Sequence, residues 1–163
     1  MNAEFSLILH YAIDRFNADY AAALDSQRYA DWPAFFVADG RYIVQARENH
    51  DRGLPLALMR LESRGMMQDR VHGITQTIYH GPYYMRHIIS PARVLAVDDA
   101  GTCVRAEANY AVFRTKPGSV SEVFNVGRYL DTFERSDDGG LHLRERHCVY
   151  DSEMILNSLI YPV

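Results

Sequence analysis

The sequence predicts an α+β fold in which N-terminal helices pack on one strongly curved antiparallel sheet. In the first part of the chain apolar residues recur at helical spacing, whereas from Tyr83 onward they alternate with polar residues, as in half-buried strands. Helices followed by a run of strands with short turns between them are typical of the α+β class. The 163 residues contain no linker, repeat or low-complexity tract, so we expect a single domain that spans residues 1–163.

The helices are expected in the first half of the chain. Within residues 5–24, apolar side chains follow one another in steps of one, three or four residues, which predicts a long amphipathic helix. A second, short helix is expected to begin at Asp31, which can cap it, and Pro33 is tolerated in its first turn. Apolar residues within 66–78 predict a third helix, although Gly73 weakens that segment.

The strands are expected mainly in the second half of the chain. Residues 85–97 are rich in β-branched side chains and are interrupted by Pro91, which predicts an edge position or a bulge. Residues 104–112 alternate between apolar and polar types, which predicts a strand with one buried face. Further strands are expected at residues 42–45, 120–135 and 141–150.

Composition and charge exclude several classes of protein. Hydrophobic residues make up 48% of the chain and charged residues 23%, which is close to the average of globular domains. The net charge is −4 and no basic stripe is present, which argues against a nucleic acid as partner. No apolar run reaches the roughly 18 residues of a membrane-spanning helix, and the N-terminus lacks the basic region of a signal peptide. We therefore expect a soluble, cytoplasmic protein without a membrane partner.

The cysteines and histidines do not form a metal motif. Cys103 and Cys148 are expected to be free, buried thiols in a reducing compartment, the alternative being a regulatory disulfide between neighbouring strands. Neither stands in a Cys-x-His or Cys-x-x-His pair, the spacing of a histidine-ligated iron–sulfur cluster. His142 and His147 lie five positions apart on a predicted strand, so their side chains would point to opposite faces, about 16 Å apart. We expect no metal and no cofactor on this chain, since a shared metal would need both histidines on a helix.

Nucleotide-binding and nucleophile motifs are also absent, but the sequence contains residues that could carry out acid–base catalysis. The sequence has no glycine-rich phosphate loop and no Gly-x-Ser-x-Gly elbow. A helix-covered curved sheet forms a cone, which can hold an Asp or His base together with Tyr donors. The candidates for such a set are Tyr29, Asp31, His87, Tyr129, Asp131 and His147. The interpretation we favour is structural, with these residues half-buried in strands and their polar atoms bonded to neighbours.

Charged residues also stand inside otherwise apolar segments. They are Asp69, Arg70, Arg86, His87, Arg114, Glu145, Arg146 and Asp151. A buried arginine usually needs a carboxylate partner, so we expect structural or interface ion pairs here. A clamp for the carboxylate of a substrate is the alternative.

Several motifs, in a fixed order along the chain, carry a resemblance to a known family. They are Trp32-Pro33-x-Phe35-Phe36, Tyr42 before Arg47-Glu48-Asn49, Gly65-Met66-x-x-Asp69-Arg70, Tyr84-x-Arg86-His87, Phe113-Arg114, Glu122-x-x-x-x-Gly127-x-Tyr129-x-Asp131, and Leu143-x-Glu145-Arg146 before Asp151. In order and spacing, residues 11–151 resemble the small (β) subunit of the Rieske non-haem iron aromatic-ring-hydroxylating oxygenases. Within that family, the chain is most similar to subunits that act on aromatic carboxylates, such as those of salicylate 5-hydroxylase and the anthranilate and terephthalate oxygenases.

The resemblance implies a cystatin-like cone, the fold shared by nuclear transport factor 2 and ketosteroid isomerase. It also implies that the Rieske 2Fe-2S cluster and the mononuclear Fe(II) belong to a separate large (α) subunit, which the small subunit supports in an α3β3 assembly. Electrons would reach that α subunit from NAD(P)H through a reductase and a ferredoxin. The chain itself would then be a non-catalytic subunit of an enzyme that hydroxylates an aromatic ring.

Two alternatives remain. One is a stand-alone isomerase or dehydratase, of the ketosteroid isomerase type, that uses Asp131, His147 and Tyr129 inside the cone. The other is a dimeric binding module without chemistry. An open apolar cavity in which Asp, His and Tyr converge would favour the isomerase, whereas a cone filled with side chains would favour the oxygenase subunit.

Overall fold

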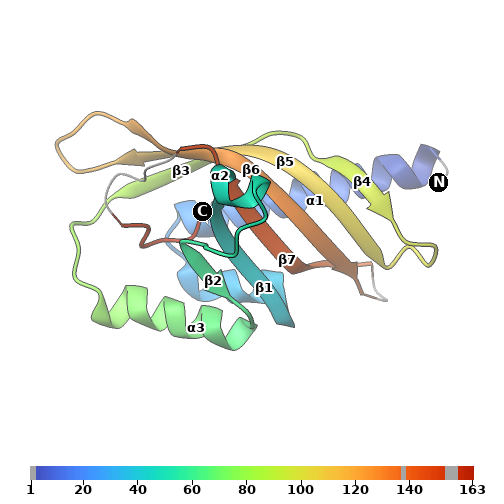
Figure 1. Ribbon diagram of the computed structural model, residues 1–163, viewed down its shortest axis with the longest axis horizontal. Coiled ribbons are helices and arrows are strands. Elements are labelled where there is room, and N and C mark those ends of the chain that lie inside the picture. The colour runs from blue at the N-terminus through green and yellow to red at the C-terminus, as the bar shows by residue number, and fades with distance from the viewer. Residues whose placement is uncertain (1–2, 137–138, 153–157) are drawn as a thin grey trace.

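The computed structural model describes residues 3–136, 139–152 and 158–163. The chain begins with the long helix α1 (Ala3–Asp25) and the 3₁₀ helix η1 (Tyr29–Phe35), and continues into strand β1 (Phe36–Ala46). Next come α2 (Arg47–Asp51), β2 (Met59–Leu61), α3 (Arg64–His72) and the π-helical turn η2 (Gly73–Thr77). The remaining strands are β3 (Tyr84–Ile89), β4 (Arg93–Val97), β5 (Cys103–Thr115), β6 (Glu122–Arg135) and β7 (Leu141–Tyr150). In Figure 1 the strands form one curved sheet, with α1 crossing behind it and α3 beside its β1–β2 edge.

The sheet is mixed rather than purely antiparallel. Its strands follow the order β2-β1-β7-β6-β5-β3, and β4 also pairs with β5. Among the described strands every pairing is antiparallel except that between β1 and β7, which is parallel. The predicted antiparallel sheet is wrong at this pairing. A tight turn imposes antiparallel order only on the two strands that it joins, and the chain from β1 to β7 passes through every other strand of the sheet.

The sheet is curved by bulges and by a glycine. The register between β6 and β7 shifts between Thr132 and Phe133, and the register between β5 and β6 shifts once as well. A bulge bends the strand that carries it and increases its twist. At Gly127 a Cβ atom would lie 2.1 Å from the carbonyl oxygen of Val149, so only glycine permits this close approach of β6 to β7. The curvature turns the sheet into a cone that faces α1.

The hydrophobic core lies between α1, η1 and the concave face of the sheet. Its largest fully buried side chains include Tyr20, Trp32, Phe36, Tyr42, Tyr129 and Phe133. The ring of Trp32 meets that of Tyr42 edge-on, with centroids 5.0 Å apart. Large aromatic side chains bury much apolar surface and, for Tyr and Trp, require a hydrogen-bond partner for the polar end. The interior of the cone is therefore both apolar and rich in hydroxyl groups.

The helices agree with the sequence prediction except at their ends. The residues predicted as the first helix, 5–24, lie within α1. The helix predicted at 66–78 ends at His72 and continues only as the wider turn η2, which begins at Gly73, a residue that disfavours an α-helix. Asp31 lies inside η1 rather than at its start, where the N-cap is Arg28. None of the helices in the described part of the chain is long and apolar enough to cross a membrane.

The strands differ from the prediction mainly where an element is short or interrupted. The segment predicted at 85–97 is divided around Pro91 into β3 and β4, because proline cannot donate to a strand ladder. Strand β1 is longer than the predicted 42–45, and α2 and β2 are absent from the prediction. Elements of three to five residues contain too few side chains to show a period.

Candidate functional site

A buried ion pair between two neighbouring strands occupies the centre of the cone. Asp131 on β6 and Arg146 on β7 face each other in the register of the sheet. Arg146 donates from Nε and Nη2 to the two carboxylate oxygens, at 3.0 and 2.7 Å, and from Nη2 to the side-chain oxygen of Asn17 at 2.6 Å. The ring centroids of Tyr20 and Tyr129 each lie 4.2 Å from the guanidinium carbon. No part of Arg146 reaches the solvent.

These surroundings hold Arg146 in its charged form. Burial opposes the charge, but the Asp131 carboxylate and the two tyrosine rings outweigh that effect and raise the pKa of Arg146 above its ordinary value. Both oxygens of Asp131 are occupied by the guanidinium fork, and such bidentate bonds are the strong kind. Asp131 is therefore a structural anchor and is not placed to take a proton from a substrate.

The C-terminal segment (residues 158–163) fills the remaining depth of the cone. Val163 is completely buried, and its backbone N–H donates to the hydroxyl of Tyr42 at 2.8 Å. Its carbonyl oxygen accepts from the hydroxyls of Tyr42 at 3.0 Å and Tyr20 at 3.3 Å. Trp32 in turn donates from Nε1 to the hydroxyl of Tyr20 at 3.0 Å. Burial raises the pKa of both tyrosines, so their hydroxyls stay protonated and keep donating to the segment.

Tyr161 fixes the outer part of the C-terminal segment. Its ring stacks on that of Tyr29, with centroids 4.8 Å apart, and lies 4.6 Å from the ring of Tyr83. Its hydroxyl lies 2.6 Å from Nε2 of His80. Arg70 donates from Nη2 to two backbone carbonyl oxygens of the segment, at 2.8 and 2.7 Å. The interior of the cone is thus occupied by the protein itself.

The residues predicted for an isomerase do not converge. Tyr129 and Asp131 point into the cone, whereas His147 lies on the outer face, because successive strand residues alternate between faces. On that face, Nε2 of His147 lies 2.8 Å from Oε1 of Gln45, and its ring centroid lies 5.3 Å from that of His50. Burial, together with the neighbouring cationic groups, lowers the pKa of His147 to about 4. An acid–base set of these three side chains is therefore not formed.

The structure instead contains an Asp–His pair that the sequence analysis did not find. Nδ1 of His87 on β3 lies 2.7 Å from Oδ1 of Asp25, and the backbone N–H of His87 donates to the same carboxylate at 3.1 Å. Arg86 approaches that carboxylate to 3.6 Å, and both Asp25 and His87 line a groove of about 530 Å³ between α1 and β3. The His87 side chain is 0% exposed, and its Nε2 has no hydrogen-bond partner among the described residues. The Asp25 carboxylate thus binds both the ring and the backbone N–H of His87 and ties the end of α1 to β3.

One sequence signal could have found this pair. Asp25 ends α1, where the negative end of the helix dipole makes an acidic residue unfavourable. An acidic residue at that end requires a compensating partner elsewhere in the fold, and the backbone and side chain of His87 supply it.

Apart from Arg114, which is buried, the other charged residues singled out in the sequence lie nearer the surface. Ion pairs join Arg114 to Glu122 at 2.6 Å, Arg41 to Glu145 at 2.7 Å and Arg47 to Asp151 at 3.3 Å. Asp69 and Asp31 are exposed, and Arg70 binds backbone carbonyls rather than a carboxylate. The structure thus brings Arg146 to a buried carboxylate as expected, while a role of the whole set in assembly stays a prediction.

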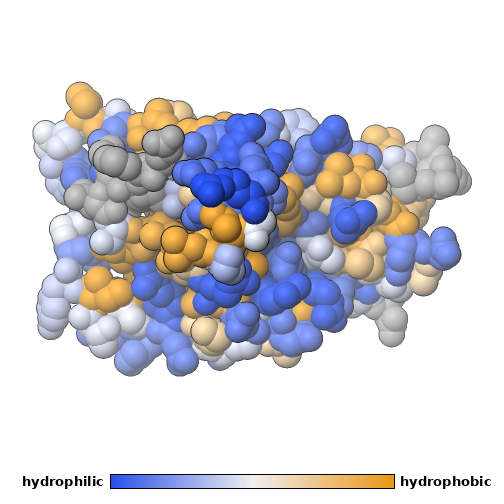
Figure 2. All heavy atoms as spheres, viewed as in Figure 1, coloured by the Kyte–Doolittle hydropathy of each residue, from blue (hydrophilic) through white to orange (hydrophobic). Residues whose placement is uncertain are grey.

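Large apolar side chains are exposed outside the cone. They include Tyr84 and Ile88 on β3, Val123 on β6, and Leu56 and Leu58 in the loop between α2 and β2. In Figure 2 apolar and charged residues are mixed over the face of the molecule seen in Figure 1. Exposed apolar groups with a polar rim are typical of surfaces that meet another protein.

The two cysteines and the histidines considered as metal ligands lie on strands β5 and β7. Among the described residues, no group of three or more His, Cys, Asp or Glu side chains could hold a metal ion. His142 and His147 both lie on β7, so the helix that would bring them together does not occur. Cys103 and Cys148 are free, as predicted, and lie on β5 and β7, which β6 separates. Cys148 is buried, but Cys103 is only half-buried.

Comparison with known proteins finds relatives along most of the chain. A family model described as the ring hydroxylating beta subunit matches residues 20–157. The terephthalate 1,2-dioxygenase, terminal oxygenase component subunit beta 2, of Comamonas sp is 32% identical over 157 residues, which cover 96% of this chain and 100% of that protein. The anthranilate 1,2-dioxygenase small subunit of Burkholderia cepacia is 30% identical over 144 residues, which cover 88% of each chain.

A solved structure shows the same architecture. The beta subunit described as that of an aromatic-ring-hydroxylating dioxygenase from Novosphingobium aromaticivorans matches with a TM-score of 0.87 at 39% identity, over 96% of this chain and 97% of that one. The helix-covered cone of the nuclear transport factor 2 type is confirmed, apart from the parallel pairing of β1 and β7.

Proposed function

This chain belongs to the ring-hydroxylating β-subunit family, and we propose that it is the non-catalytic small subunit of a multicomponent Rieske oxygenase. In this proposal the large (α) subunit holds the Rieske 2Fe-2S cluster and the mononuclear Fe(II), and receives electrons from NAD(P)H through a reductase and a ferredoxin. The two subunits assemble as α3β3 in the cytoplasm. The substrate is an aromatic carboxylate of the salicylate, anthranilate or terephthalate class, and the names of two relatives support the last two of these.

The filled cone is the observation that carries the non-catalytic role. An enzyme of this fold needs an accessible base and a space for its substrate. Here Tyr20 and Tyr42 bind Val163, and Asp131 is held by Arg146, so these polar groups are used within the protein. The hydroxyl of Tyr129 has no partner among the described residues, but it is completely buried and out of reach of a substrate. These bonds stabilise a rigid body, which suits a subunit that supports a partner.

The exposed apolar side chains support the partner role. Tyr84, Ile88 and Val123 lie on β3 and β6, where no described part of this chain covers them. Burial of apolar surface is the main favourable term in protein association. A large subunit that covers these residues would remove them from water, which gives the assembly its driving force.

The proposal is tested by rebuilding the complex with variants of the three residues considered for acid–base chemistry. The chain is co-expressed with the Rieske large subunit, the size of the complex is measured by light scattering, and product is counted per assembled complex. His147→Gln, Tyr129→Phe and Asp131→Asn should each keep turnover within about tenfold, which is under 1.4 kcal/mol of barrier. Loss of a general acid or base would lower the rate by about 10²–10⁴-fold. A drop of a hundredfold or more in a fully assembled complex would show that this chain takes part in the chemistry.

The stand-alone isomerase and the dimeric binding module predict other outcomes. An isomerase would be active without a large subunit. A binding module would purify as a dimer that does not bind the large subunit. Co-purification of the two subunits in equal amounts is expected instead. Failure of the chain to associate with any Rieske large subunit would refute the proposed function.

A further inference from the structure

Helix α1 carries a second stripe of residues at heptad spacing, separate from the stripe that faces the core. Leu9, Ile13 and Tyr20 face the core and are at most 3% exposed. Steps of four and three residues also connect a set on the other side of the helix, called the outer stripe below: Leu7, Tyr11, Asp14, Ala18, Ala21 and Asp25. A helix face with this spacing is typical of a surface on which another helix packs.

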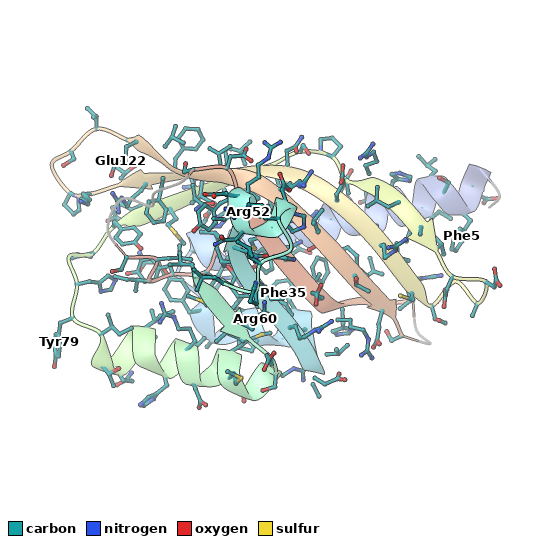
Figure 3. The ribbon with its side chains drawn as sticks, in the orientation of Figure 1. Phe5, Phe35, Arg52, Arg60, Tyr79 and Glu122 are labelled. Carbon is teal, nitrogen blue, oxygen red and sulfur yellow. The ribbon has the colours of Figure 1, made fainter. Side chains whose placement is uncertain are left out.

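The first half of the outer stripe projects large apolar side chains into solvent. Leu7 is 72% exposed and Tyr11 70%, and Ile8 beside them is 58% exposed. Figure 3 shows Phe5, near the start of α1, at the end of the molecule far from Tyr79. Single exposed apolar residues are ordinary, but three of them on neighbouring turns form a patch that is typical of a protein interface.

The second half of the outer stripe borders the groove of about 530 Å³ between α1 and β3. Two carboxylates hold the helix along this edge of the sheet. Asp14 accepts from the backbone N–H of Ala92 at 2.8 Å, and Asp25 accepts from that of His87 at 3.1 Å. Between these two attachments the helix wall of the groove is built from small side chains, those of Ala18, Ala21 and Ala22. This half of the stripe is therefore hollow where the first half projects.

The two halves of the outer stripe are complementary to each other, and a two-fold axis brings them together. We propose that α1 packs antiparallel against α1 of a second copy of this chain. In this arrangement Leu7 lies opposite Ala22 of the second copy, Tyr11 lies opposite Ala18, and the symmetry repeats both contacts. The large side chains of each copy then enter the groove of the other. An isologous contact of this kind closes at two copies.

The charges of the helix favour the antiparallel orientation. At the middle of the pair, Asp14 of each copy comes opposite Arg15 of the other, and the Arg15 side chain is 68% exposed and can reach across. Towards the ends Glu4 faces Asp25, whose charge is already balanced by Arg86 at 3.6 Å. A parallel pair would instead place identical residues side by side, Asp14 against Asp14, and the alanines would face only one another.

The paired surface is separate from the one attributed above to the large subunit. Tyr84 and Val123 are exposed on the outer face of the sheet, whereas α1 crosses behind the sheet in Figure 1. Pairing through α1 therefore leaves these two residues accessible. It requires only the side chains of this chain, so its test does not depend on the proposed function.

Sedimentation equilibrium of the full chain, purified without a large subunit, tests the pairing. We expect a dimer that dissociates in the micromolar range, since one helix from each copy makes a small interface. Tyr11→Ala should weaken the dimer at least about tenfold, because each copy loses its contact. Ala18→Arg, at an exposed helix position, should fill the groove and weaken the dimer at least as much.

Val120→Ala is the matched control. It removes an apolar side chain that is 88% exposed, in the hairpin between β5 and β6, and should leave the dimer unchanged. Circular dichroism of each variant checks that the fold is kept. A monomer, a trimer, or a dimer that responds to Tyr11→Ala no more than to Val120→Ala would overturn the proposal.

Cysteine cross-linking tests the orientation of the two helices. In a background of Cys103→Ser, a Tyr11→Cys chain mixed with an Ala18→Cys chain should form a mixed disulfide, because facing positions lie within the roughly 4.4–6.8 Å between Cα atoms that a disulfide spans. The second Tyr11–Ala18 contact of the mixed pair stays intact. Each variant alone should form no cross-link, since its two cysteines lie seven residues apart along the helix axis, about 10 Å. Cross-linking of Ala18→Cys with itself, or none in the mixture, would refute the antiparallel pairing.

Discussion

The Arg146→Met substitution isolates the contribution of the buried ion pair, because methionine has a similar length but carries no charge and donates no hydrogen bond. It removes both bonds to Asp131 and the bond to Asn17. The carboxylate that remains belongs to a side chain that is only 2% exposed, so its charge is left almost without contact with solvent. We therefore expect the substitution to lower the free energy of unfolding, because it leaves the Asp131 charge buried without a partner.

The size of the effect follows from the burial of both partners. Removal of one member of a buried pair costs about 3–5 kcal/mol of unfolding free energy. In a domain of this length each kcal/mol lowers the melting temperature by roughly 2–4 °C, so a fall of about 10 °C is expected. The double variant Arg146→Met/Asp131→Leu removes both charges and should recover most of the loss, since an apolar replacement of a buried pair is often neutral or stabilising.

Urea denaturation measures these free energies, with the fluorescence of the single tryptophan, Trp32, as the signal. Arg144→Met is the matched control: this arginine lies on the same strand, is exposed, and pairs with Glu134 and Asp39 at the surface. Its loss should cost less than about 1 kcal/mol. The reasoning fails if Arg146→Met costs no more than this control, or if the double variant is as unstable as the single one.

Three further outcomes are expected. Tyr42→Phe should lower the unfolding free energy by about 1–2 kcal/mol in urea denaturation, because it breaks both bonds to Val163. Between pH 6.5 and 4, His147 is protonated in the unfolded chain but neutral in the folded chain, so the free energy of unfolding should fall as the pH drops through this window. His147→Gln should reduce that fall by about 1 kcal/mol, measured by urea denaturation at pH 7 and pH 4.5. Metal analysis of the purified chain should find no stoichiometric iron or zinc, and finding either would contradict the expectation that this chain holds no metal.

Local pattern was enough to predict the elements but not the way in which they meet. The apolar stripe of α1 and the alternation in β5 depend on neighbouring residues only, and both are visible in the sequence. The parallel pairing of β1 with β7 and the insertion of the C-terminal segment join residues far apart in the chain. No periodicity encodes such contacts, because each side chain shows only that it is apolar or polar and not which partner it has.

The candidate site illustrates the same limit on a smaller scale. Arg146 and Asp131 were both singled out, but for different roles, one as a structural charge and the other as a base. The antiparallel pairing of β6 with β7, two strands that follow each other in the sequence, places them opposite each other, so this contact could have been predicted. Asp25 was missed because its partner, His87, comes 62 positions later in the chain, in an edge strand.

The residue types inside this cone are those of an acid–base site, and their bonds give them another role. A tyrosine hydroxyl acts on a substrate only if no other group takes its hydrogen bond, and the hydroxyls of Tyr20 and Tyr42 are bound to Val163. A carboxylate acts as a base only if it can accept a proton, and Asp131 is held by a guanidinium at its two oxygens. Occupancy of the cone, rather than the residues that line it, therefore separates this subunit from an enzyme of the same fold.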